Sequence, residues 1–125
     1  MLEKDYHAAK DYFGKATDLF PSNPEALHSL AIINQQLGEH QIAIQCLRKA
    51  SQLDPGNILY EEGIAHSLLA KQELTETVRQ ADAILKTDPK NETAWQVKVK
   101  ALLKSNKPEE ARQAIHFALA VVENP

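Results

Sequence analysis

Asp54-Pro55-Gly56-Asn57 recurs as Asp88-Pro89-Lys90-Asn91 when the chain is compared with itself at an offset of 34 residues. Pro21-Ser22-Asn23 occupies the same place one period earlier. A fixed period of this length is typical of helical repeat arrays. One repeat cannot bury its own apolar face and must stack on its neighbours, so such a chain presents an extended surface rather than a closed pocket. The repeat therefore favours a binding module.

Each period predicts two helices. The first begins at Asn23-Pro24-Glu25, where Asn can cap, Pro suits the first helical position and Glu lies at the positive end of the helix dipole. It ends at Leu37-Gly38, because glycine readily adopts the left-handed backbone of a helix terminus. A second apolar pattern runs from Ile42 to Leu53 before the next Pro-containing loop. The unit is therefore helix, tight turn, helix and loop, and we expect the tight turns near Gly38, Gln72 and Asn106.

Residues 24–57 contain eight positions at which the type of side chain follows a fixed order: large, Leu, small, Gly, Ala, large, Ala and Pro. The residues at these positions are, in the same order, Leu27, Leu30, Ala31, Gly38, Ala43, Leu47, Ala50 and Pro55. This set resembles the pattern of the tetratricopeptide repeat (TPR) family. Residues 58–91 and 92–125 follow it with departures, and residues 1–23 supply the second helix of a partial repeat. The resemblance implies an all-α fold, a right-handed α-solenoid of about 3.5 stacked helix-turn-helix TPR units with seven helices, in one domain over residues 1–125.

Two residues depart from the pattern where the family has apolar side chains. Glu61 stands in an aromatic position and Lys98 in a leucine position. Burying an unpaired carboxylate is costly. We therefore expect either that Tyr60 takes the place of Glu61 or that the register shifts locally.

The resemblance implies a concave groove, lined by the first helix of each repeat, that binds a protein or peptide partner. The expected groove positions, repeat by repeat, are Glu25, His28, Ser29, Ile32 and Gln36; Leu59, Glu62, Gly63, His66 and Leu69; and Thr93, Gln96, Val97, Lys100 and Lys104. Apolar Ile32, Leu59 and Leu69 would hold apolar side chains of a ligand, and the polar neighbours would set its register. This interpretation predicts a scaffold or adaptor that binds a peptide or helical segment.

One well-known use of the fold is not expected. TPR domains that hold the C-terminal carboxylates of chaperones use Lys and Asn, then Asn, then Lys and Arg at set groove positions, because cations and amides match a carboxylate. This chain has, in those places, His28, Ile32, Gly63, Thr93 and Val97. A ligand with apolar side chains is the better expectation.

Composition narrows the classes of partner. The net charge of −3 comes from 14 basic and 17 acidic residues, without a basic stripe, so nucleic acid is not an expected partner. No apolar run approaches membrane-spanning length and the N-terminus is too charged for a signal peptide, so we expect a soluble chain, with the cytoplasm favoured.

No set of residues predicts catalysis. Cys46 has no paired His at an identifiable position, so we interpret it as a packing residue rather than a nucleophile. Glu62 and His66 lie four residues apart, and His28 could approach them, but a metal site needs more ligands. We expect no enzyme, cofactor or metal.

The ends of the chain suggest an alternative function. An apolar stripe without a polar cap occupies the final helix, at Ile115, Ala118, Leu119 and Val122, and another lies near the N-terminus, at Leu2, Tyr6, Ala9 and Phe13. Repeat arrays normally close with a polar face. The chain could therefore be a structural array that forms a homo-oligomer, or stacks on the rest of a longer TPR protein, through its terminal helices. The expected self-association residues are Ile115, Leu119 and Val122.

Overall fold

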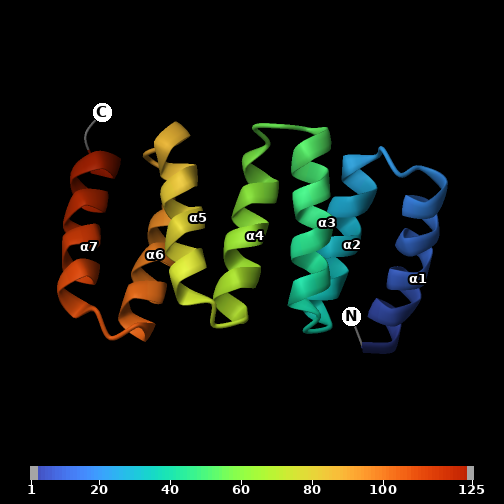
Figure 1. Cartoon of the computed structure of the whole chain (residues 1–125), viewed down its shortest axis with the longest axis horizontal. Coiled ribbons are helices and arrows are strands. Elements are labelled where there is room, and N and C mark those ends of the chain that lie inside the picture. Colours follow the sequence, from blue (N-terminus) through green and yellow to red (C-terminus); the bar gives the residue numbers. More distant parts are fainter. Residues whose placement is uncertain (1–2, 124–125) are drawn as a thin grey trace. The chain divides into compact units, whose positions relative to one another are not determined.

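The computed structural model describes residues 3–123, and over that span the chain forms seven α-helices and no β-strand (Figure 1). In chain order the helices are α1 (Glu3–Leu19), α2 (Pro24–Gln36), α3 (His40–Leu53), α4 (Ile58–Ala70), α5 (Leu74–Thr87), α6 (Glu92–Lys104) and α7 (Pro108–Glu123). The predicted all-α repeat fold is confirmed.

The helices recur with the period of the sequence. The first helices α2, α4 and α6 begin at residues 24, 58 and 92, and the second helices α3, α5 and α7 begin at residues 40, 74 and 108. The tight turn inside each pair has a left-handed residue, with φ of 79° at Gly38, 63° at Gln72 and 57° at Asn106. Glycine adopts this backbone without strain and asparagine tolerates it. The three expected turns are confirmed.

An asparagine in each Pro-containing loop starts the following helix. The side-chain Oδ1 atoms of Asn23, Asn57 and Asn91 accept hydrogen bonds of 2.8–3.2 Å from backbone N–H groups at the starts of α2, α4 and α6. Asn57 and Asn91 also donate from Nδ2 to the carboxylates of Asp54 and Asp88, at 3.0 and 3.1 Å. The aspartate holds the asparagine in the rotamer that caps the helix. The recurring Asp and Asn of the loop thus act together.

The chain divides into two compact units, Met1–Ser67 and Leu68–Pro125. Unit 1 contains α1, α2, α3 and most of α4, and unit 2 contains the last residues of α4 with α5, α6 and α7. In unit 1, α2 packs against both α1 and α3. In unit 2, α6 packs against both α5 and α7.

The core of unit 1 includes the contact that α4 makes with the α2–α3 pair. Leu47 of α3 is 1% exposed, and its methyl carbon Cδ1 would lie 2.9 Å from a Cβ atom on Gly63 of α4. Tyr60 is buried while Glu61 is only half-buried, so the tyrosine takes the aromatic position, as one of the two expectations had it. Gly63 contributes to this packed contact, because a side chain at that position would meet Leu47.

Unit 2 has a core cluster of Leu102, Ala111 and Ala114, and the half-buried Lys98 lies on α6 with a paired charge. Its Nζ atom lies 2.7 Å from Oδ1 of Asp82 on α5 and 5.5 Å from the centre of the Trp95 ring. The stem of the lysine can therefore be buried while its charge is paired. Val97, by contrast, is 1% exposed, so the prediction that it lines a groove is wrong. The reason is that α6 lies between α5 and α7, which cover more than one of its faces.

The apolar stripe predicted near the N-terminus is only partly described. Tyr6, Ala9 and Phe13 are half-buried, because α1 packs against α2, and Leu2 lies outside the described residues. These three residues are therefore partly covered. The large apolar side chains that α1 does expose are Tyr12 and Leu19.

Candidate binding surfaces

Unit 1 carries nine of the predicted groove residues, five on α2 and four on α4: Glu25, His28, Ser29, Ile32, Gln36, Leu59, Glu62, Gly63 and His66. The His28 ring meets the Tyr60 ring edge to face, with centroids 5.1 Å apart, so this histidine helps to join α2 to α4. Ile32 and Leu59 remain 44% and 59% exposed. The surface of unit 1 thus offers apolar side chains to solvent, and their predicted role in binding stays a prediction.

One residue that holds these two helices together was missed by sequence reasoning. The amide Nε2 of Gln35 donates to the carbonyl oxygen of Gly63 at 3.2 Å and to the hydroxyl of Ser67 at 2.8 Å. These bonds link α2 to α4 beside the Leu47 contact. The only sequence signal was the position of Gln35 in the first helix of a repeat, which does not distinguish a bridging amide from a solvated one.

Unit 2 has an apolar groove between α6 and α7, with a volume of about 310 Å³. We call it the α6–α7 groove, and its lining residues are Trp95, Gln96, Val99, Lys100, Ile115, Ala118 and Leu119. Ile115 and Leu119 are 45% and 53% exposed. Gln96 and Lys100 are the polar members, and both are exposed.

The α6–α7 groove brings together residues that the sequence had assigned to two different functions. Gln96 and Lys100 are predicted partner-binding residues, whereas Ile115 and Leu119 are predicted self-association residues. The remaining predicted residues of unit 2 lie outside it. Leu69 on α4 and Thr93 on α6 are half-buried, and Val97 on α6 is buried. Lys104 is exposed on α6 and Val122 is 37% exposed on α7. The two hypotheses therefore compete for one surface.

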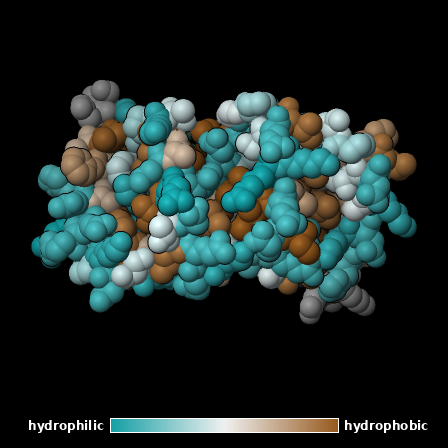
Figure 2. Space-filling view, in the orientation of Figure 1, coloured by the Kyte–Doolittle hydropathy of each residue, from teal (hydrophilic) through white to brown (hydrophobic). Residues whose placement is uncertain are grey.

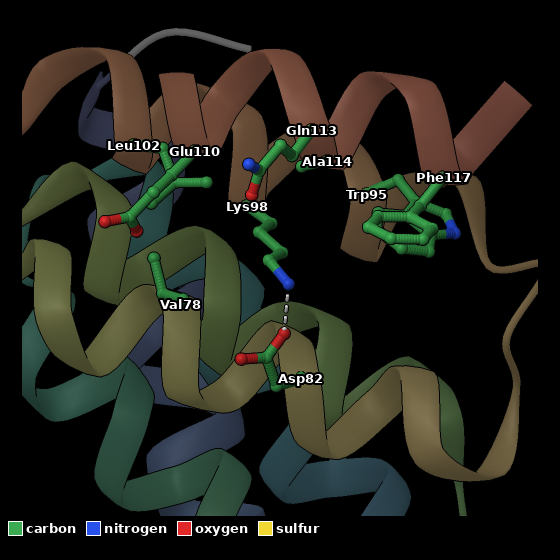
Figure 3. Close-up of a pocket in the computed structure, with 9 residues that line it drawn as sticks. All are labelled: Val78, Asp82, Trp95, Lys98, Leu102, Glu110, Gln113, Ala114 and Phe117. Atoms are coloured by element: carbon green, nitrogen blue, oxygen red, sulfur yellow. Dashed lines mark ion pairs between the residues drawn. The ribbon is translucent and has the colours of Figure 1, made fainter. Parts of the chain in front are cut away.

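A second cavity of unit 2, of about 350 Å³, lies among α5, α6 and α7 (Figure 3). Figure 3 shows the Lys98 side chain reaching towards Asp82 within it, while Trp95 and Phe117 lie at the opposite end from Leu102 and Glu110. Trp95 lines both this cavity and the α6–α7 groove. Its indole Nε1 donates to the carbonyl oxygen of Pro89 at 2.8 Å, which fixes the ring between the two.

Two titratable groups among the described residues, Cys46 and Tyr60, have raised pKa values. Burial raises the pKa of the Cys46 thiol, although the nearby Lys49 lowers it in part, so thiolate is disfavoured. Burial also raises the pKa of Tyr60, and the carboxylates of Asp54 and Glu25 raise it further. Within residues 3–123 no three His, Cys, Asp or Glu side chains are grouped to hold a metal ion.

Polar side chains dominate the face seen in Figure 2, although apolar side chains reach the surface in patches, including over α7. The large exposed apolar residues of α7 are Ile115, Phe117, Leu119 and Val122. Among the residues that the structure describes, no helix combines the length and apolar character needed to cross a membrane.

Comparison with known proteins identifies the repeat. Residues 1–66 match the family model of the tetratricopeptide repeat. The chain is 33% identical over 92 residues to the small glutamine-rich tetratricopeptide repeat-containing protein 2 of Mycosarcoma maydis, covering 74% of this chain and 26% of that protein. This chain therefore spans about a quarter of the curated relative.

Solved structures share the fold. The MamA protein superposes with a TM-score of 0.84 at 20% identity, covering 92% of this chain and 63% of that one. An O-GlcNAc transferase mutant of Thermobaculum terrenum gives a TM-score of 0.67 at 26% identity, covering 80% of this chain but 19% of the transferase. The match to the transferase thus concerns a small part of that enzyme.

Proposed function

The chain belongs to the tetratricopeptide repeat family, and on that premise we propose that it is a scaffold or adaptor that holds a peptide or helical segment of a partner protein. The family points to a protein–protein interaction module without catalytic function. The finer assignment, to a partner segment bound at particular residues, is supported by exposed apolar surface at repeat positions that could otherwise be polar.

The observation that carries the proposal is the α6–α7 groove. Trp95, Val99, Ile115, Ala118 and Leu119 give it an apolar floor, and Gln96 and Lys100 provide polar groups beside that floor. Binding sites for protein segments combine apolar contact area with a few polar groups that set orientation. The groove therefore suits an amphipathic segment better than a fully charged one.

The exposed residues of unit 1 extend the proposal. Ile32 and Leu59 are apolar and exposed, and Gln36 and His66 offer exposed polar groups on the same two helices. We assign to these side chains, with Glu62 and His28, further contacts to a partner segment. Leu69 and Lys104 are the corresponding candidates on α4 and α6.

The test begins with partners recovered by the immobilised wild-type chain. The segment of each partner that binds is then synthesised and titrated against wild type, Leu119→Lys and the double variant Ile32→Glu with Leu69→Glu. Leu53→Lys is the matched control, because Leu53 is 40% exposed on α3 and lies outside both surfaces. We expect Leu119→Lys and the Ile32→Glu, Leu69→Glu double variant each to lose affinity at least tenfold, with unchanged helical circular dichroism. The Leu53→Lys control should bind like wild type. Full affinity in both Leu119→Lys and the double variant would show that Leu119, Ile32 and Leu69 do not form the binding site.

A second candidate function is a structural array that self-associates. It is favoured by the exposure of Ile115, Phe117, Leu119 and Val122 on α7, since each buried large apolar side chain contributes roughly 1.5–3 kcal/mol. Leu119→Lys combined with Val122→Lys should then shift an oligomer towards monomer, measured as solution mass against concentration. A wild-type chain that stays monomeric at high concentration would exclude this candidate.

A further inference from the structure

We infer that the α6–α7 groove binds an amphipathic α-helix of a partner, in the way that the α2–α3 pair binds α4 in unit 1. The bound helix has a small residue at its centre, apolar side chains around that residue and an acidic side chain facing Lys100. This inference rests on the proposed function, because it specifies the kind of segment that the module holds.

The first step is the repeat itself. The helices α6 and α7 begin two periods after α2 and α3, so each groove residue has a counterpart at the same repeat position in unit 1. The counterparts of Trp95, Gln96, Val99, Ile115 and Ala118 are Leu27, His28, Ala31, Leu47 and Ala50. The groove is therefore the equivalent of the surface on the α2–α3 pair that α4 contacts.

The contacts of α4 show what that surface accepts. Three of them mark the register of the helix: Tyr60 against His28 at 5.1 Å between centroids, Gly63 beneath Leu47, and the Ser67 hydroxyl 2.8 Å from Gln35 Nε2. The effect of this cover is seen by comparing counterparts. Leu47 is 1% exposed, whereas Ile115 at the same repeat position is 45% exposed. The repeat position is thus built to be covered by a helix.

The differences between counterparts define the partner helix. Ile115 replaces Leu47, so the residue opposite it must again be small, since a Cβ atom at Gly63 already comes within 2.9 Å of Leu47. Leu103 replaces Gln35 and is 56% exposed, so an apolar side chain is favoured where α4 has Ser67.

Lys100 gives the partner its charge. This lysine replaces Ile32 and forms no ion pair with the side chains that the structure describes. In the register of the three marker contacts, its position is level with the middle of the bound helix, next to the small residue. An acidic side chain there completes the complementarity, with Lys104 one turn further along α6. A second copy of this chain cannot offer α4, which is already packed in unit 1.

The probe is a synthetic peptide with residues 57–70 of this chain carrying Ser67→Leu, which keeps Gly63 and Glu62. Trp95 is the only tryptophan of the chain and lines the groove, so its fluorescence reports binding. We expect a saturable change with wild-type protein. A peptide that also carries Gly63→Leu should bind at least tenfold more weakly, because its side chain would meet Ile115.

Protein variants locate the site. Leu119→Lys should weaken peptide binding at least tenfold, whereas Leu53→Lys should bind like wild type, and circular dichroism with thermal melting checks that both remain folded. Lys100→Glu should weaken binding about two- to fivefold, as expected for an exposed ion pair, and Glu62→Lys in the peptide should restore it. Restoration by the reversed pair is a result that a general loss of folding would not produce.

Three outcomes would overturn the inference. The first is equal binding of the Gly63→Leu peptide, and the second is unchanged binding to Leu119→Lys. The third is a change in Trp95 fluorescence that occurs without peptide, increases with protein concentration together with the solution mass, and is abolished by Leu119→Lys. That result would assign the α6–α7 groove to a second copy of the chain. If no peptide binds while natural partner segments still depend on Leu119, the helix inference fails and the proposed function stands. If those segments also bind Leu119→Lys at full affinity, both fail.

Discussion

The contact between Leu47 and Gly63 can be tested by a double-mutant cycle. Leu47→Ala removes a fully buried side chain, and such changes cost about 2–5 kcal/mol in the free energy of unfolding. Part of the resulting cavity borders Gly63, which has no side chain that could move into it. We therefore expect a value in the upper part of that range, about 3–5 kcal/mol.

Gly63→Ala alone combines two opposed effects. Alanine is favoured over glycine in a helix by about 1 kcal/mol, but its Cβ atom would lie 2.9 and 3.3 Å from the two methyl carbons of Leu47, and overpacking costs about 1–3 kcal/mol. The net change is a loss of about 0–2 kcal/mol. In the Leu47→Ala background the clash is gone and the new methyl group partly fills the cavity. The same substitution should then stabilise by about 1 kcal/mol, a coupling of about 1–3 kcal/mol.

The measurement is urea unfolding followed by far-ultraviolet circular dichroism for the four proteins of the cycle. Gly14→Ala is the matched control, because a Cβ at that position of α1 would meet no heavy atom within 4 Å beyond its chain neighbours and the nearby backbone of its own helix. This change should stabilise the chain by about 1 kcal/mol. Additive effects of Leu47→Ala and Gly63→Ala, within about 0.5 kcal/mol, would refute the contact. So would an equal gain from Gly63→Ala in both backgrounds.

Three further predictions concern turns, charge and capping. Gln72→Gly should raise the free energy of unfolding by about 1 kcal/mol, because the left-handed backbone at φ 63° is strained for glutamine, and a loss on urea unfolding would contradict this. The pKa of Tyr60 is raised above 10.0 in the folded chain, so the contribution of Tyr60 to the free energy of unfolding is fully present below pH 10.0 and is lost as the pH rises through the folded pKa. Tyr60→Phe should therefore reduce the loss of stability at alkaline pH, and an unchanged dependence of stability on pH would contradict this. Asn91→Ala should cost about 1–2 kcal/mol, because it removes the cap of α6 and the hydrogen bond to Asp88, and thermal melting would show no shift if the cap were unimportant.

Local signals in the sequence were sufficient to predict the helices and their turns. Capping by Asn23 and left-handed turns at Gly38 and Asn106 depend on residues close in the chain, and a 34-residue period repeats them. The burial of Tyr60 in the aromatic position of the repeat, in place of Glu61, was one of the two expectations from the sequence, because burial of a carboxylate is costly wherever it occurs. Family membership followed from the same pattern.

The candidate site could be predicted only in part. Exposed Ile32, Leu59, Gln96 and Lys100 agree with repeat positions that face away from the core, and their role in binding stays a prediction. Val97 shows the limit: helical periodicity assigns a residue to a face, but the number of helices that cover that face depends on packing.

The sequence by itself therefore determined which residues form helices, where the chain turns between them and which family the chain belongs to. The reason is that helix caps, left-handed turn residues and the spacing of apolar residues depend on residues close together in the chain. Only the tertiary structure decided that Gln96 and Lys100 share one groove with Ile115 and Leu119, and that Gln35 bridges to Ser67. These pairs are distant in the chain and meet through helix packing, in which side-chain shape and the coverage of each face decide what becomes a surface.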